Sequence, residues 1–111
     1  MMGDNLFTEF KGVIAENYVL QSLVRQFGNQ HYYWTSGNTA EVEFVLQDTG
    51  RIIPIEVKAD KNVTAKSLAY YRKQYTPQLS IRLSILNMRK DGDLLNLPLY
   101  LVDKLKFFCS L

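Results

Sequence analysis

The chain has 111 residues, a net charge of +2 and 47% hydrophobic residues, which fits one folded domain with a modest core and excludes a disordered tail. One cysteine, Cys109, and one histidine, His31, exclude an intrachain disulfide and a zinc site of the cysteine and histidine type. The low cysteine content is typical of a reducing, cytoplasmic location, and because no apolar run is long enough to cross a bilayer we expect no membrane contact.

The first predicted element is a helix over residues 5–27, because apolar residues recur there every three or four positions. Gly28 follows as a residue that can end the helix. Within the helix Gly12 costs up to about 1 kcal/mol relative to alanine, so we expect close packing against another element at that position. Glu16 borders the apolar stripe, where its stem can pack while its carboxylate stays in water.

Three strands are predicted next, over residues 31–35, 40–47 and 51–59. The first is rich in aromatic residues, and the second alternates polar with apolar residues. The third is β-branched and apolar, yet it carries Glu56 and Lys58 two positions apart. Side chains alternate between the faces of a strand, so these two charged groups leave on the same face.

A turn signal at residues 48–51 predicts a two-residue loop between the second and third strands. The register that follows pairs Glu43 with Glu56 and Glu41 with Lys58, and a longer turn with a bulge is the alternative. The other face of this hairpin is then apolar throughout, formed by Val42, Phe44, Leu46, Ile53, Ile55 and Val57.

The predicted pair of facing glutamates, Glu43 and Glu56, needs an explanation because like charges opposite each other destabilise a strand pair. A divalent cation between the two carboxylates is one explanation. A shared proton with a raised pKa is a second. Simple exposure to water is the third.

The second half of the chain contributes a helix over 62–75, a strand over 80–86, a polar loop over 87–93, a strand over 97–102 and a helical turn or tail over 103–111. Pro98 suggests that the last strand lies at a sheet edge. The passage from strand to helix to strand implies a parallel pair with a crossover. The order of elements predicts an α/β sandwich with a central mixed sheet of four to five strands flanked by two helices.

Positive charge gathers between residues 58 and 73, where Asp60 is the single acidic residue. Such a group of cations is able to contact phosphates without sequence preference, although a solvated helix face is the alternative interpretation. The candidate nucleic-acid contacts are Lys61, Lys66, Arg72 and Lys73.

These features resemble the restriction-endonuclease-like, or PD-(D/E)XK, nuclease superfamily. The likeness rests on Glu43, on Glu56 and Lys58 in the next strand, and on Glu16 in the preceding helix. More closely, the chain is similar to the domain of unknown function often found C-terminal to the ATPase domain of prokaryotic AAA-type proteins. That similarity lies in residues 11–17, 32–34, 40–45, 53–59 and 80–84. The resemblance implies that residues 1–111 form one nuclease-like domain, the C-terminal part of a longer ATPase.

The resemblance also implies a metal-dependent phosphodiesterase acting on DNA. Glu43 and Glu56 would bind Mg²⁺ or Mn²⁺, Lys58 would orient the attacking water, and Glu16 would complete the acidic cluster. The first strand acid is commonly aspartate in this superfamily, and the longer Glu43 shifts its carboxylate by roughly 1 Å, enough to slow catalysis. The alternative function is therefore a catalytically silent module that binds nucleic acid or a protein, such as the N-terminal ATPase domain of the parent chain.

Overall fold

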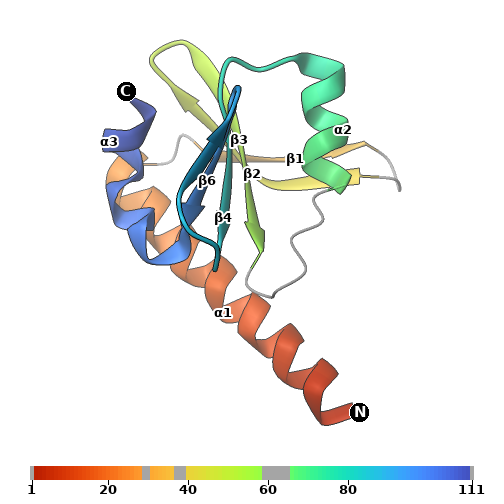
Figure 1. Ribbon diagram of the computed structural model, residues 1–111. Helices are drawn as coiled ribbons and strands as arrows, with labels where there is room; N and C mark the ends of the chain where they lie inside the picture. The colour runs from red at the N-terminus through yellow and green to blue at the C-terminus, as the bar shows by residue number, and fades with distance from the viewer. Residues whose placement is uncertain (1, 29–30, 37–39, 59–65, 111) are drawn as a thin grey trace.

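In the computed structural model a mixed sheet lies between helices (Figure 1). The structure describes the backbone of residues 2–28, 31–36, 40–58 and 66–110, and the side chains of residues 12–28, 42, 44–58 and 67–110. The α/β sandwich predicted from the order of elements is confirmed. The elements are α1 (Met2–Phe27), β1 (His31–Ser36), β2 (Ala40–Asp48), β3 (Arg51–Lys58), α2 (Lys66–Tyr75), β4 (Ser80–Ser84), β5 (Arg89–Asp91), β6 (Leu94–Pro98), the 3-10 helix η1 (Leu99–Lys104) and α3 (Leu105–Cys109).

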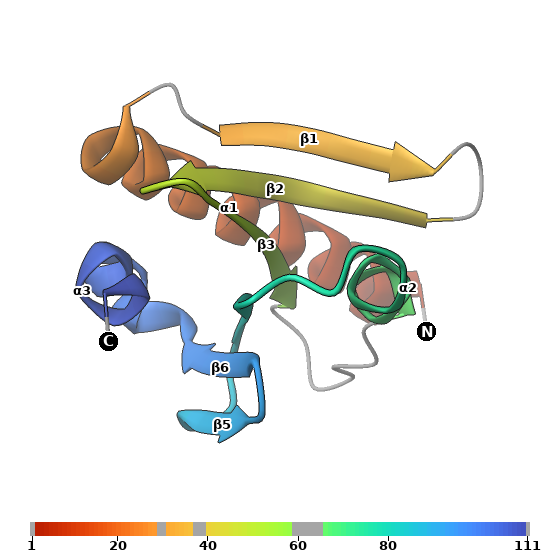
Figure 2. The ribbon, with the colours of Figure 1, turned by 90° about the horizontal axis from the view of Figure 1, so that it is seen from above.

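Within the described residues the sheet has six strands in the order β1-β2-β3-β4-β6-β5. The first three strands are antiparallel neighbours, β3–β4 and β4–β6 are parallel, and β5 returns antiparallel to β6. Because α2 connects β3 to its parallel neighbour β4, the predicted crossover is confirmed. The sheet is strongly twisted, and α2 lies on the opposite side from α3 (Figure 2).

The β2–β3 hairpin has the predicted two-residue loop and, from that loop to the pair Phe44–Ile55, the predicted register. Thr49 and Gly50 have φ values of 48° and 81°. Positive φ at both positions is what a type I′ turn requires, and this turn matches the twist of the two strands. The last pair of the hairpin falls one residue before the predicted pairing of Glu43 with Glu56.

A β-bulge in β2 explains why the hairpin pairing ends there. Tyr32 of β1 pairs with Val45 of β2, and Trp34 pairs with Val42. The two pairs are two residues apart in β1 but three residues apart in β2, so β2 contains one extra residue. The extra residue reverses the alternation of side chains at the start of β2. Val42 therefore packs with Val45 and Tyr71 of α2, and its predicted place on the face of Phe44 is wrong.

The C-terminal strands also differ from the prediction. The segment expected as a polar loop contains β5, whose exposed residues form an edge strand without apolar alternation, and Gly92 makes the turn to β6 with φ 61°. The last strand is β6, so residues 99–104 are helical and not extended. The prediction that the strand carrying Pro98 lies at a sheet edge is wrong, because β6 lies between β4 and β5. Pro98 is the last residue of β6 and pairs with Ser84 of β4.

The main core lies between α1 and the sheet, and η1 and α3 close it. Ala15, Val19 and Leu23 of α1 pack against Ile53 and Ile55 of β3. Gly28, with φ 67°, ends α1 as predicted, and its N–H donates to the Val24 carbonyl at 2.9 Å. The expected close packing at Gly12 is wrong, since no described atom lies within 4 Å of the position of an added Cβ.

Hydrogen bonds to one carboxylate attach η1 to α1. The Ser22 hydroxyl and Arg25 donate to Asp103 Oδ1 at 2.5 and 2.8 Å, and the Tyr18 hydroxyl donates to Oδ2 at 3.2 Å. The hydrogen bond from Ser22, followed by that from Arg25, holds the pKa of Asp103 below its usual value. Gln26 adds a bond to the Val102 carbonyl at 2.7 Å, so the end of the sheet and the last helices form one unit with α1.

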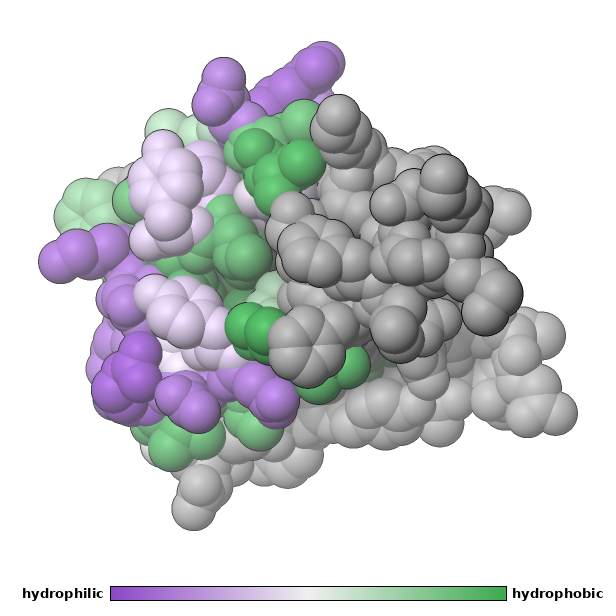
Figure 3. All heavy atoms as spheres, turned by 90° about the horizontal axis from the view of Figure 1, so that it is seen from below, coloured by the Kyte–Doolittle hydropathy of each residue, from purple (hydrophilic) through white to green (hydrophobic). Residues whose placement is uncertain are grey.

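Exposed apolar side chains gather on the face seen from below (Figure 3). Ile14, Tyr18, Ile85 and Tyr100 border a shallow cavity of about 530 Å³ between α1, the end of β4 and η1. In the described part of the chain no helix has the length and apolar character needed to span a membrane.

Candidate functional site

The candidate site lies on the face of the sheet that α1 does not cover. Ile53, Ile55 and Val57 of β3 point into the core beneath α1, so the alternate residues Glu56 and Lys58 leave on the other face. This confirms the prediction that the two charged residues share one face of a largely buried strand.

Glu56 is enclosed by two cations. Lys58 Nζ lies 4.0 Å from Glu56 Oε1, and Arg82 Nε lies 3.6 Å from Glu56 Oε2. The parallel register places Arg82 of β4 directly beside Glu56. The Glu56 side chain is 13% exposed, against 35% for Lys58 and 20% for Arg82, so the carboxylate is the most deeply placed of the three groups.

The electrostatic balance at Glu56 is unfavourable to its charge. Burial raises the pKa of this carboxyl, and the neighbouring Lys58 and Arg82 offset that rise only in part. Among the described residues Glu56 Oε2 and Arg82 Nε are buried without a hydrogen-bond partner, since 3.6 Å is too long for a hydrogen bond. Titratable groups in such settings are enriched at functional sites.

Arg82 belongs to a row of polar residues that crosses four strands. Glu56 pairs with Arg82, Arg82 with Asn96 of β6, and Asn96 with Arg89 of β5. Partners in register point to the same face, so the row carries two arginines on the Glu56 side of the sheet. Sequence reasoning missed this row, although one polar residue between Ile81 and Leu83 was a signal for a functional or paired Arg82.

A cavity of about 410 Å³ adjoins this row. Arg82, Arg89 and Asn96 line it together with the segment that joins β4 to β5. The Asn96 amide donates to the Asn87 carbonyl at 3.1 Å, and its oxygen accepts from the Ser84 hydroxyl at 2.8 Å. Asn96 therefore fixes the wall of the cavity. The two arginines supply its positive charge, and Asp91, which also lines the cavity, accepts a hydrogen bond from Arg89 Nε at 3.1 Å.

Of the three acids predicted for the site, the structure describes the side chains of Glu16 and Glu56. Glu16 lies half-buried on α1, which covers the other face of the sheet, and no described hydrogen bond or ion pair joins it to Glu56. Glu43 lies at the bulge of β2, and its side chain is outside the described residues, as is that of Glu41.

Mg²⁺ and Mn²⁺ prefer several oxygen ligands, and the described donor set does not fit them. Glu56 supplies one carboxylate. Lys58 and Arg82, which lie within 4.0 Å of it, repel a metal cation from this position. Among the described residues there is no group of three or more histidine, cysteine, aspartate or glutamate residues that could hold a metal ion.

Of the four predicted nucleic-acid contacts, the structure describes the side chains of Arg72 and Lys73. Lys61 and the Lys66 side chain lie outside the described residues. Arg72 lies six residues further along α2, about 9 Å along the helix axis, and its guanidinium binds Asp93 just before β6. Lys73 is exposed beside Arg72, so both lie away from the end of β3 that carries Lys58.

Fold and site together define an α/β sandwich domain with an ionic cluster on its central strands. A family model described as Domain of unknown function (DUF4143) matches residues 11–100, and the chain belongs to this family. The matched region runs from α1 to the beginning of η1 and so includes the whole sheet. No curated protein and no solved structure matches the chain significantly.

Proposed function

We propose that this domain is a nuclease-like module that binds the phosphodiester backbone of DNA on the face that carries Glu56, Lys58 and Arg82. The observation that carries the proposal is the row Glu56–Arg82–Asn96–Arg89, which presents arginines beside a cavity of about 410 Å³. Guanidinium groups bind phosphate through paired, charge-assisted hydrogen bonds.

The spacing of the row suits an extended polyanion. Neighbouring strands lie about 4.8 Å apart, so Arg82 and Arg89, separated by β6, have backbones about 10 Å apart. Lys58 adds a third cation at the end of β3. Phosphates that contact these side chains would be recognised by charge and not by base sequence.

The partner of this module is proposed to be the ATPase domain that precedes it in the parent chain. This part of the proposal rests on the sequence resemblance described above. It assigns DNA binding to the module and nucleotide hydrolysis to the ATPase domain.

The test is the affinity for a short DNA duplex, measured by fluorescence anisotropy over a series of salt concentrations. Lys58→Gln and Arg89→Gln are each expected to weaken binding roughly tenfold at low salt and to lower the salt-dependence slope by about one. Lys104→Gln, at an exposed position on η1, is the matched control and is expected to bind like the wild type. Equal affinity of all four proteins, or no binding by the wild type at low salt, would contradict the proposal.

A second candidate function is the metal-dependent hydrolysis of DNA. One observation favours it: Glu56 Oε2 is buried next to Lys58 on the central strand, and no described residue donates a hydrogen bond to it. This function requires Glu43 as a further ligand, because the described carboxylates do not complete a metal site. We would measure DNA cleavage in Mn²⁺ by the wild type, Glu43→Ala, Glu56→Ala and Lys58→Ala. Cleavage by the wild type alone supports hydrolysis, whereas cleavage by all four, which indicates a contaminant, or by none leaves binding as the function.

A further inference from the structure

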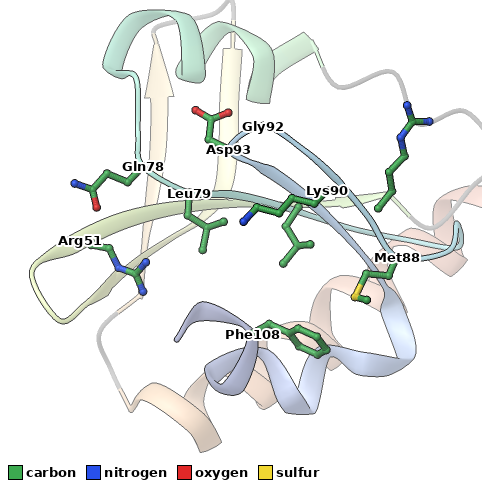
Figure 4. Close-up of a pocket in the computed structure, with 10 residues that line it drawn as sticks. Arg51, Gln78, Leu79, Met88, Lys90, Gly92, Asp93 and Phe108 are labelled. Atoms are coloured by element: carbon green, nitrogen blue, oxygen red, sulfur yellow. The ribbon is translucent and has the colours of Figure 1, made fainter. Parts of the chain in front are cut away.

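A different cavity, of about 440 Å³, lies on the opposite face of the sheet (Figure 4). The β5–β6 hairpin, the segment leading into β4 and the helix α3 enclose it. Its wall combines apolar and cationic residues, chiefly Arg51, Leu79, Met88, Lys90, Leu95 and Phe108.

The register of the strands explains why these residues meet. Lys90 pairs with Leu95, a core residue, so its side chain leaves on the core face of the hairpin. Arg51 and Leu79 stand two positions before the core residues Ile53 and Ile81, which puts them on the same face. All of them therefore point to the side of the sheet that α3 covers.

The charge inside the cavity is positive. The guanidinium of Arg51 and the ammonium of Lys90 both turn toward its centre, whereas the carboxylate of Asp93 points away, toward α2 (Figure 4). That carboxylate is bound by Arg72. Arg51 donates one N–H to the Cys109 carbonyl, and this bond holds its head group against α3.

We propose that this cavity binds a small organic anion with an apolar body, whose head is a carboxylate or a phosphate monoester. Leu79, Leu95 and Phe108 would contact the apolar body, while Arg51 and Lys90 would bind the head. A concave, mostly apolar site of this volume with a few converging polar groups is typical of small-molecule sites. The site opens on the core face of the β5–β6 hairpin, and it adjoins the proposed DNA-binding face at β5, since Arg89 lines both cavities.

The test uses decanoate as the probe, with decyl phosphate as a second anion and decanol as the uncharged comparison. Binding is measured by calorimetry and located by two-dimensional amide NMR. Decanoate or decyl phosphate is expected to bind at millimolar concentration or tighter and to shift amides of β5, β6 and α3, and decanol is expected to bind about tenfold more weakly.

Lys90→Gln is the informative variant, because Lys90 is exposed and makes no described hydrogen bond whose loss would unfold the chain. It is expected to weaken anion binding about tenfold, whereas the control Lys104→Gln is expected to leave it unchanged. Equal binding of decanol and decanoate, unchanged binding by Lys90→Gln, amide shifts elsewhere, or no binding of either anion would each overturn the proposal.

Discussion

Glu56 holds its carboxylate where burial disfavours the charge, although Lys58 and Arg82 lie within 4.0 Å of it. Ion pairs at a half-buried site rarely repay the full cost of removing a carboxylate from water. Groups retained in such positions are often there for function, at the expense of stability. The raised pKa of Glu56 should therefore be visible in how the stability of the protein depends on pH.

We expect Glu56→Gln to be more stable than the wild type at pH 7. The folded pKa of Glu56 lies above the reference value of 4.5, so the folded chain favours the protonated carboxyl. The stability contributed by this group is present below pH 4.5 and is lost as the pH rises through the folded pKa. Glutamine is uncharged and nearly isosteric, so it escapes that loss.

Thermal unfolding followed by circular dichroism between pH 3 and pH 8 measures this difference. The melting temperature of Glu56→Gln is expected to exceed that of the wild type at pH 7, and the gap is expected to close below pH 4.5. A lower melting temperature of the variant at pH 7 would mean that the ion pairs outweigh the burial of the charge.

The shared face of Glu56 and Lys58 was predictable, because side chains alternate along any strand. The place of Arg82 beside Glu56 was not. The register between the parallel strands β3 and β4 is set by how α2 packs, and no local sequence pattern encodes it.

At the scale of elements, the two-residue hairpin loop was predictable from the Thr49–Gly50 turn signal, and α1 from its apolar spacing. The bulge in β2 was not predicted, since no glycine or proline marks it, and its one signal is the apolar Val45, which breaks the alternation of 40–47. The bulge moves Val42 to the α2 side and ends the hairpin pairing before Glu43. The predicted pairing of Glu43 with Glu56 assumed that β2 is regular along its whole length, and the bulge in β2 removes that regularity.

The helix α1 offers a prediction at Gly12, where an added methyl group meets no described atom within 4 Å. Gly12→Ala is expected to raise the free energy of unfolding by about 0.5–1 kcal/mol, because alanine lowers the entropy lost on forming the helix. Urea denaturation measures the change.

The control for Gly12→Ala is Gly28→Ala at the end of the same helix. Gly28 has φ 67°, where a Cβ is strained, so its replacement is expected to destabilise the protein by about 1 kcal/mol. Destabilisation by Gly12→Ala would show that this position does pack against another part of the protein.

At the scale of the whole molecule, the two faces of the sheet carry sites of different character, which meet at Arg89 of β5. The α2 side carries the row from Glu56 to Arg89 beside a cavity of about 410 Å³, and the α3 side carries the smaller group of Arg51 and Lys90 around about 440 Å³. The α/β class followed from the order of elements along the chain. The two cavities did not, because each is formed by strands whose pairing depends on long-range packing.

The central claim is that the face around Glu56 binds the DNA backbone, and the affinity of Glu56→Gln tests it most directly. The variant removes a negative charge beside Lys58 and Arg82, so DNA phosphates would meet less repulsion. With EDTA present and at low salt, we predict that Glu56→Gln binds a DNA duplex about threefold to tenfold tighter than the wild type, with a smaller gap at high salt. Equal or weaker binding by Glu56→Gln under these conditions would contradict the account.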